Sequence, residues 1–433
     1  MNDNKTSQPK QLYMLSAVEM GERFNFYGMR ALLMLFMTSA ILSFTDKTAG
    51  RIFGLFVALV YLTPIFGGFM ADRFLGKRTA IIIGALCMIT GQLTLASYGF
   101  IPPQIALALG LAFIIVGNGF FKPNISSIVG EMYTPDDPRR DAGFTIFYMG
   151  INVGAFLAPI ICGSLGEKIA FKYGFLAAAV GMTLSLLWFL FVQHNYLGDL
   201  GKRPAMAARK KTKAEQKPLT KEEKQRIGAI FIFVFFSIFF WAFYEQAGSS
   251  LTLFAQRSTD RVIFGWEMPA SYFQSIPALF VVLLAPLFAM LWRKMGKNEL
   301  STPAKFAWGL GLLGVGYIII TCAAYVYQTS GAAVSMLWLI ALYLMHVFGE
   351  LCLSPVGLSM ISKLSPAKYV SIFMGIWFTG EFFGGILGGF VAGNYAEGAL
   401  VKLFSIPAIT SIASALILWA LSGKIKQWMN GVR

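Results

Sequence analysis

The sequence is poor in charge and in the side chains that build most enzyme centres. Charged residues make up 13% of the 433 positions, whereas soluble proteins usually carry about 25%. Two histidines are present, and the four cysteines (Cys87, Cys162, Cys322 and Cys352) lie in apolar runs without metal-ligand spacing. A nucleophile elbow and a glycine-rich phosphate loop are also missing. We therefore expect no enzyme, no metal site and no cofactor.

Long apolar runs are what the sequence has in abundance. Hydrophobic residues make up 56% of the chain, with 44 glycines and 40 phenylalanines, as in packed membrane helices. A membrane helix needs roughly 20 mostly apolar residues. Twelve such runs occur, at approximately 12–43, 51–71, 79–100, 104–130, 142–164, 172–194, 227–256, 270–293, 303–327, 333–363, 368–395 and 400–423. The sequence predicts an all-α, multi-pass membrane protein, and its polar start predicts no cleavable signal peptide.

Lysine and arginine are distributed unevenly between the two sides of such a protein. With the N-terminus in the cytoplasm, 26 of the 36 fall in cytoplasmic segments and 7 in outer loops. Because positive charge concentrates on the cytoplasmic side, this arrangement predicts that both termini are cytoplasmic. The net charge of +15 then faces anionic lipid, and we expect no nucleic-acid partner.

The chain also repeats itself. The segment "DRFLGKR" after the second run and "WRKMGKN" after the eighth share the pattern Arg-x-x-Gly-Lys. We predict an N-terminal six-helix bundle over 1–195, a basic cytoplasmic linker over 196–226 and a C-terminal six-helix bundle over 227–433. Two parallel repeats of six spans are the layout of the major facilitator superfamily, whose substrate site lies near the middle of the membrane. "GGFMADRFLGKR" resembles the loop signature of that superfamily.

Eight ionisable residues fall well inside the predicted spans, where each costs roughly 2.5–3.5 kcal/mol at a helix centre. They are Glu19, Glu22, Arg23, Arg30, Lys122, Glu245, Glu350 and Glu381. At about 100° per residue, the four charges of the first run form one stripe. The opposite face, with Val18 and Leu32, is predicted to meet lipid. A cluster of this size, divided between both halves, indicates a water-filled cavity that serves transport.

Such a cluster can couple a proton to a substrate. Burial favours the protonated form of a carboxyl, whereas a neighbouring arginine favours the carboxylate. If the arginine moves to a substrate carboxylate, the glutamate takes a proton more readily. The coupling must be reciprocal, so that the proton also promotes substrate binding.

These motifs together resemble the proton-dependent oligopeptide transporter (POT) family. "EMGERFNFYG" is similar to the E-x-x-E-R-F-x-Y-Y-G motif of helix one, and "FYMGINVGAF" to the F-Y-x-x-I-N-x-G signature of helix five. "FFKPNISS", "FYEQAGSSLTLF" and "GELCLSPVGLS" match on helices four, seven and ten. The resemblance covers nearly the whole chain. It implies a proton-coupled symporter that imports di- and tripeptides by alternating access.

The resemblance also implies roles for single residues. Arg23 and Lys122 would hold the carboxylate of the peptide, and Glu350, helped by Asn152, would hold its amino terminus. The proton-coupling residues would be Glu19, Glu22, Arg23 and Glu245. The pocket would be lined by Tyr27, Tyr61 and Trp377. Two gating salt bridges would break and reform, Arg30–Glu245 and Lys122–Glu350.

Some positions depart from the family pattern. The first tyrosine of the helix-one motif is Phe26, and Pro277 stands where helix eight usually has an asparagine. Glu381 is outside the pattern, so that it is either a satisfied polar residue or an extra proton or amine site. His346, four residues before Glu350, is either a buried packing residue or a pH sensor.

The partners follow from this reading. We expect di- and tripeptides and protons as substrates, membrane lipid as surroundings, a monomer as the working unit and the bacterial cytoplasmic (inner) membrane as the location. An alternative on the same fold is proton-coupled transport of another small anion, such as nitrate or an organic acid, because Arg23 and Lys122 suit any anion.

Overall fold

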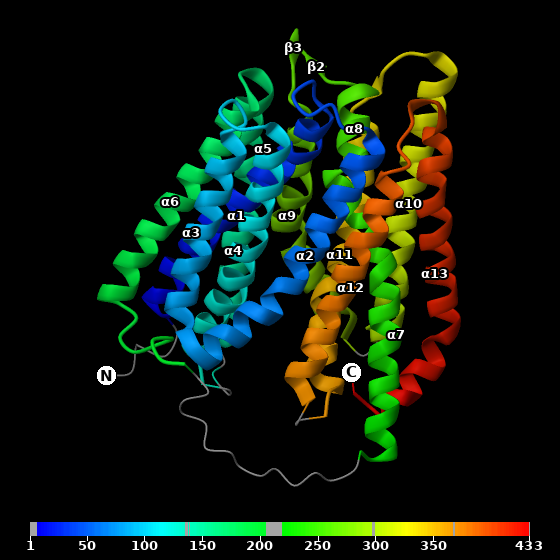
Figure 1. Ribbon diagram of the computed structural model, residues 1–433. Coiled ribbons are helices and arrows are strands. Elements are labelled where there is room, and N and C mark those ends of the chain that lie inside the picture. The colour runs from blue at the N-terminus through cyan, green and yellow to red at the C-terminus, as the bar shows by residue number, and fades with distance from the viewer. Residues whose placement is uncertain are drawn as a thin grey trace. The chain divides into compact units, whose positions relative to one another are not determined.

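A computed structural model describes residues 7–134, 137, 139–204, 219–296, 299–366 and 369–432. Within these residues lie twelve helices of 20 residues or more. They are α1 (Lys10–Thr38), α2 (Asp46–Met70), α3 (Lys77–Ala96), α4 (Pro103–Glu131), α5 (Arg140–Lys168), α6 (Phe171–Asn195), α7 (Lys221–Tyr244), α9 (Ile276–Met295), α10 (Thr302–Ser330), α11 (Leu337–Leu364), α12 (Val370–Ala392) and α13 (Leu400–Trp428) (Figure 1). Eleven are long and apolar enough to cross a membrane, and the remaining one, α1, carries five charged residues, of which four form the predicted stripe.

The helices form two compact units. Unit 1 contains Met1–Leu42 and Leu62–Thr212, and unit 2 contains Ser43–Tyr61 and Lys213–Arg433. The boundary runs through α2, so the first part of this helix packs with unit 2. The predicted linker over 196–226 lies partly outside the described residues, as does Lys297 of the predicted repeat.

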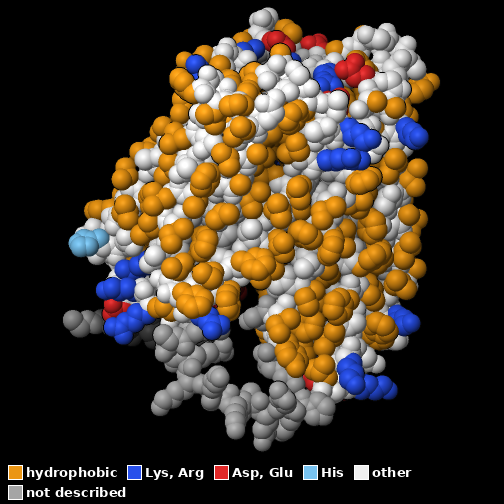
Figure 2. All heavy atoms as spheres, viewed as in Figure 1, with side chains coloured by type: hydrophobic (Ala, Val, Ile, Leu, Met, Phe, Trp, Pro, Cys, Tyr) orange, Lys and Arg blue, Asp and Glu red, His pale blue; other side chains and the backbone are white. Residues whose placement is uncertain are grey.

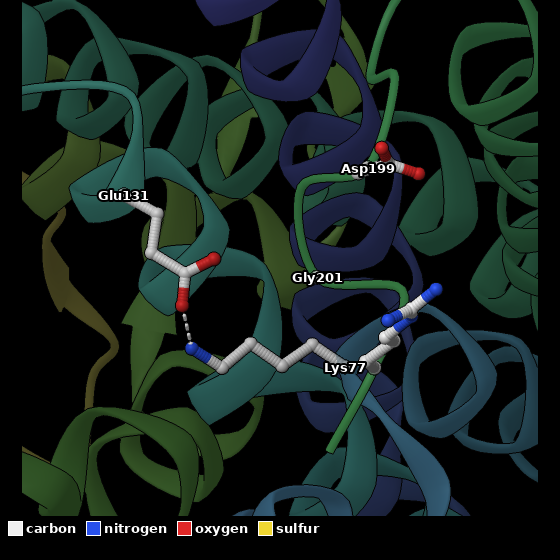
Figure 3. A pocket seen from close by; sticks show the side chains of 5 residues that line it. Lys77, Glu131, Asp199 and Gly201 are labelled. Atoms are coloured by element: carbon white, nitrogen blue, oxygen red, sulfur yellow. Dashed lines mark hydrogen bonds and ion pairs between the residues drawn. The ribbon is translucent and has the colours of Figure 1, made fainter. Parts of the chain in front are cut away.

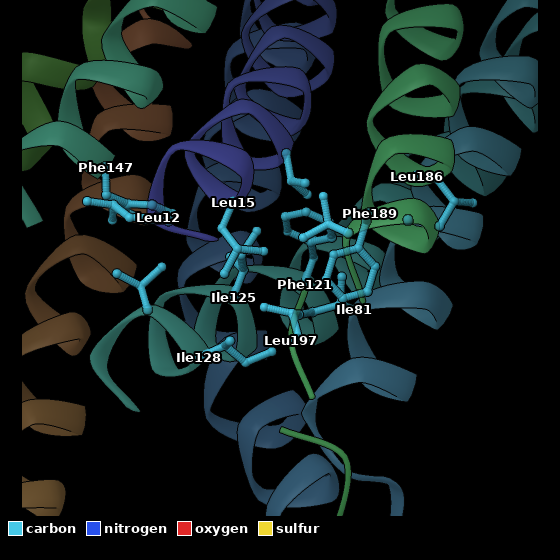
Figure 4. Packing of buried hydrophobic residues seen from close by; sticks show 14 of the residues in the cluster. Leu12, Leu15, Ile81, Phe121, Ile125, Ile128, Phe147, Leu186, Phe189 and Leu197 are labelled. Carbon is cyan, nitrogen blue, oxygen red and sulfur yellow. The ribbon is translucent and has the colours of Figure 1, made fainter. Parts of the chain in front are cut away.

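The core of unit 1 surrounds the first turns of α1. Leu12 and Leu15 of α1 lie in one buried cluster with Phe121 and Ile125 of α4 and Phe189 of α6 (Figure 4). The far side of α1 is buried as well, because Val18 and Leu32 have no exposed surface. The prediction that this face meets lipid is wrong: α5 and α6 pack against α1 and cover it.

The chain after α6 is tied to the start of α3. Arg78 donates hydrogen bonds to the carbonyl oxygens of Gln193, Gly198 and Leu200. Gly76, at φ 76°, ends the preceding π-helical turn, a conformation that favours glycine. Beside it, Lys77 pairs with Glu131 in an open pocket that Asp199 also lines (Figure 3).

Short extended segments connect the helices of unit 2. Strand β1 (Thr259–Asp260) pairs in parallel with β4 (Val334–Ser335). Strands β2 (Val262–Ile263) and β3 (Trp266–Glu267) form a hairpin, whose two-residue turn has positive φ at Phe264 and Gly265, as this kind of turn requires.

A seam of glycines joins the first part of α2 to α12 within unit 2. A Cβ atom at Gly389 would lie 2.7 Å from the Cα of Gly54, and one at Gly50 would lie 2.6 Å from the nitrogen of Gly393. Glycines four residues apart let helix backbones approach closely, which compensates for the weak hydrophobic driving force in a membrane. Arg257 adds a bidentate ion pair with Asp46, at 2.8 and 2.9 Å.

Charged side chains are sparse on the visible surface. Figure 2 shows hydrophobic side chains along the sides of the helices, whereas most of the visible Lys and Arg side chains lie near helix ends. This distribution is typical of helices that lie in lipid.

We expect Gly389→Ala to lower the free energy of unfolding of the purified protein by about 1–3 kcal/mol, because the new methyl group overlaps α2. The change is measured as a lower melting temperature. The matched control is Gly375→Ala on the same helix, where a Cβ meets nothing within 4 Å. Alanine raises the helix propensity equally at the two positions of α12, so the difference between the two melting temperatures measures the overlap. Equal melting temperatures would contradict the seam.

Candidate functional site

The charged stripe of α1 is built around one arginine. Arg23 Nε lies 2.9 Å from Glu19 Oε1 and 2.5 Å from Glu22 Oε2. All three side chains are at least 95% buried. Two carboxylates and one guanidinium leave one negative charge in excess, so the group needs a further cation or a proton.

Helix α4 supplies the remaining partners of Glu22. Asn118 Nδ2 donates a hydrogen bond of 3.0 Å to Glu22 Oε1. Lys122, one turn further along α4, acts on Glu22 electrostatically. The sequence analysis missed Asn118, although its spacing of four from Lys122 places both on one helix face. The structure thus brings the predicted residues Glu19, Glu22, Arg23 and Lys122 together within unit 1.

Aromatic rings extend the stripe along α1. The guanidinium carbon of Arg23 lies 5.8 Å from the centroid of the Phe26 ring, and that of Arg30 lies 5.7 Å from the Tyr27 ring. The Phe26 departure therefore removes a hydroxyl and keeps an aromatic ring beside the cation. Asn152 on α5 donates to the carbonyl oxygen of Tyr148 in its own helix, at 2.9 Å.

In unit 2 the seventh predicted span is broken. Helix α7 ends at Tyr244, a 3-10 turn covers Glu245–Gly248, and α8 (Ser250–Arg257) follows. The buried side chain of Gln246 donates to the carbonyl oxygens of Ala242 and Gly388, each at 2.9 Å, and accepts from Ser250 at 2.7 Å. The Gln246 side chain thus ties the break to a backbone carbonyl of α12 as well as to one of α7. The break places Glu245 at the end of α7, within electrostatic range of Glu350.

Glu350 has a partner that the sequence analysis did not name. The hydroxyl of Tyr244 donates to Glu350 Oε2. His346, one turn earlier on α11, is buried, and its ring centroid lies 6.1 Å from that of Tyr244 and 5.1 Å from that of Tyr317. The predicted residues Glu245, Glu350 and His346 therefore lie in one region of unit 2. Tyr244, the last residue of α7, connects this helix to α11 through its hydrogen bond to Glu350.

Other predicted residues of unit 2 are distributed over three helices. Trp377 on α12 is buried, with its ring 6.0 Å from Phe306. Glu381 lies one turn further along α12 and is also buried. Tyr61 is partly buried on α2, and Pro277 falls in the first turn of α9. The gating pairs Arg30–Glu245 and Lys122–Glu350 would each join a residue of unit 1 to one of unit 2, and both stay predictions.

Metal binding has little support in the part of the chain that the structure describes. Among those residues, no group of three His, Cys, Asp or Glu side chains is arranged to hold a metal ion. In unit 1 two buried carboxylates contact a buried guanidinium, and ionisable residues of this kind mark proton relays and ion pathways in membranes.

Membrane-spanning helices with buried, paired charges define the class of the protein, a multi-pass membrane transporter. A solved peptide transporter POT in complex with sulfate has the same fold, with a TM-score of 0.91 and 34% identity over 98% of this chain and 97% of that one. The all-α major facilitator architecture predicted from the sequence is thereby confirmed.

The chain belongs to the POT family, whose model matches residues 78–211 and 199–412. It is 37% identical to the uncharacterized transporter YclF of Bacillus subtilis, over 98% of this chain and 96% of that protein. It is 31% identical to a di-/tripeptide transporter of Lactococcus lactis subsp. lactis, with full coverage of both. The family consists of transporters, so the protein is not an enzyme.

We expect Gln246→Leu to lower the free energy of unfolding by about 2 kcal/mol, because the substitution removes four buried hydrogen bonds at the break, including one of 3.4 Å from Ser249. Thermal unfolding in detergent measures the change. Gln104→Leu, at an exposed position in the first turn of α4, serves as the control and should melt like the wild type. A Gln246→Leu protein as stable as the wild type would show that the helix break does not depend on this side chain.

Proposed function

We propose that the protein is a proton-coupled symporter of di- and tripeptides. The observation that carries the proposal is the buried group on α1 and α4, in which Arg23 contacts both Glu19 and Glu22. Such a group can exchange one anionic partner for another. The 31% identity to a di-/tripeptide transporter supports peptides as the substrate class.

Arg23 and Lys122 are the proposed partners of the peptide carboxylate. A guanidinium meets a carboxylate with two parallel hydrogen bonds, and an ammonium adds a point charge. When Arg23 turns to the peptide, Glu22 loses its strongest cationic contact and takes a proton. Peptide and proton therefore bind together, which is the requirement for symport.

Glu350 is the proposed partner of the peptide amine, with Asn152 as an additional contact. Its carboxylate is oriented by the hydroxyl of Tyr244 and lies near Glu245, so a cation that arrives here meets two acids. Di- and tripeptides carry a carboxylate and an amine whatever their side chains. Recognition of the two ends would let one site accept many sequences, with Tyr27, Tyr61 and Trp377 contacting the side chains.

Transport requires the two ends of the pathway to open in turn. We propose that Arg30–Glu245 and Lys122–Glu350 close one end and separate when it opens, as in alternating access. Protons are the proposed coupling ion, and no cofactor is needed. The proposed setting is the bacterial cytoplasmic membrane, with both termini in the cytoplasm and the monomer as the working unit.

A second candidate function is proton-coupled transport of a small anion without an amine. It is favoured by the cations of the α1–α4 group and by the sulfate bound in the similar POT structure. An uptake panel of dialanine, trialanine, nitrate and a dicarboxylate in proteoliposomes, with and without a pH gradient, separates the two. Uptake of nitrate or the dicarboxylate in place of the peptides would favour the second candidate.

We expect Glu22→Gln to abolish the accumulation of dialanine driven by a proton gradient, because an amide cannot take up the coupled proton. Uptake is measured in proteoliposomes with an alkaline interior. Exchange of labelled for unlabelled dialanine without a gradient serves as the control for folding and binding. Accumulation by the variant at the wild-type level would refute the coupling role.

We expect acetylation of the amino group of dialanine to weaken its binding at least about tenfold, since a buried ion pair is lost. In Glu350→Ala the free and acetylated peptides should bind equally. Competition with labelled dialanine measures both affinities. If the wild type binds the two peptides equally well, Glu350 does not recognise the amine.

A further inference from the structure

Asn118 has one half of its amide in use and the other half without a partner. The side chain has no exposed surface, and its Nδ2 donates to Glu22 Oε1 at 3.0 Å. Among the residues that the structure describes, its Oδ1 has no hydrogen-bond partner. A buried carbonyl oxygen without a donor is costly, so each such group calls for an explanation.

The protonation state of Glu22 provides one. A carboxylate only accepts hydrogen bonds, whereas a protonated carboxyl also donates one from its hydroxyl. A primary amide presents one donor and one acceptor side by side. It can therefore form a ring of two hydrogen bonds with a carboxylic acid, but only one hydrogen bond with a carboxylate.

We propose that Asn118 is a positioning residue that holds Glu22 in both protonation states, and that Glu22, rather than Glu19, carries the coupled proton. In the charged state, Oε1 accepts from Asn118 Nδ2 and Oε2 contacts Arg23 Nε. In the protonated state, Oε1 keeps the bond from Nδ2, and the new O–H on Oε2 donates to Asn118 Oδ1. The inference rests on the proposed function, because the peptide carboxylate is what draws Arg23 away.

The exchange balances. A proton from water binds Oε2 as Arg23 leaves its ion pair with Oε2 and turns to the peptide carboxylate. When the peptide leaves, Arg23 returns to Oε2 and the proton departs to water. The orphaned oxygen of Asn118 thus gains a donor only in the loaded state, which favours proton and peptide binding together.

Glu19 lacks this arrangement. Glu19 Oε1 accepts a hydrogen bond of 2.9 Å from Arg23 Nε. The amide of Asn118 donates its hydrogen bond to Glu22. A proton on Glu19 would therefore have no recorded amide acceptor beside it. The difference between the two acids lies in α4, which contacts α1.

The charges around Glu22 come from two helices. Helix α1 contributes Glu19, Arg23 and, further along, Arg30, and α4 contributes Lys122. Helices α3, α5 and α6 also pack against α1, and their Asp, Glu, Lys, Arg and His residues lie in the first and last turns. A change in the pH dependence of transport on altering Asn118 therefore reports on the α1–α4 group.

The test is Asn118→Leu, which keeps the size of the side chain and removes the amide. We expect proton-driven accumulation of dialanine to fall about tenfold or more, the effect of a lost hydrogen bond to a buried group, and its pH profile to shift. Gradient-free exchange of dialanine should stay within about twofold of the wild type, since the groups that hold the peptide are intact. Asn118→Ser, which retains one hydroxyl, should accumulate dialanine to a level between those of Asn118→Leu and the wild type.

The matched control is Asn124→Leu on the same helix. Asn124 is equally buried, and its amide donates to Phe120 of its own helix at 2.7 Å, so its loss should change neither accumulation nor the pH profile. An infrared difference spectrum of protonated carboxyl groups should contain a band that Glu22→Gln removes and Asn118→Leu shifts.

Three outcomes would overturn the inference: wild-type accumulation by Asn118→Leu, equal loss of exchange and accumulation, or a carboxyl band removed by Glu19→Gln instead. Absence of proton-driven peptide uptake by the wild-type protein would refute the proposed function itself. The two failures are therefore distinguishable.

Discussion

The placement of one arginine between two glutamates inside a membrane helix is the constraint on which the rest of unit 1 depends. Charges in hydrocarbon are costly, and Arg23 lowers this cost by contacting Glu19 and Glu22 at 2.9 and 2.5 Å. One guanidinium cannot neutralise both acids. The group therefore draws in Lys122 and Asn118 from α4, and its charge balance changes with each proton or anion that enters.

Such a group works only if its helices keep their register. The hydrophobic cluster of Leu15, Phe121 and Ile125 lies next to the charged positions on α1 and α4, so the apolar packing holds the polar contacts in place. In unit 2 the register of α2 and α12 depends instead on the glycine seam, where Gly54 and Gly389 let the two backbones approach closely. The break after Tyr244 is likewise stabilised by polar bonds from Gln246.

Much of the architecture was predictable from the sequence, because a membrane requires long apolar runs and helices satisfy their own backbone. Each of the twelve predicted runs coincides with a long helix, apart from the break at Glu245. That break went unpredicted because the bonds that stabilise it reach Gly388, far along the chain. The prediction for Val18 and Leu32 failed because periodicity shows that a face is apolar, and only packing shows whether lipid or another helix covers it.

The sequence by itself determined the helices, the charged stripe of α1 and the family to which the chain is similar, since these depend on composition and local spacing. Only the tertiary structure decided which groups contact each other: Asn118 with Glu22, and Tyr244 with Glu350. The physical reason is that a hydrogen bond needs atoms within about 3 Å. Residues 96 and 106 positions apart reach that distance through the packing of whole helices.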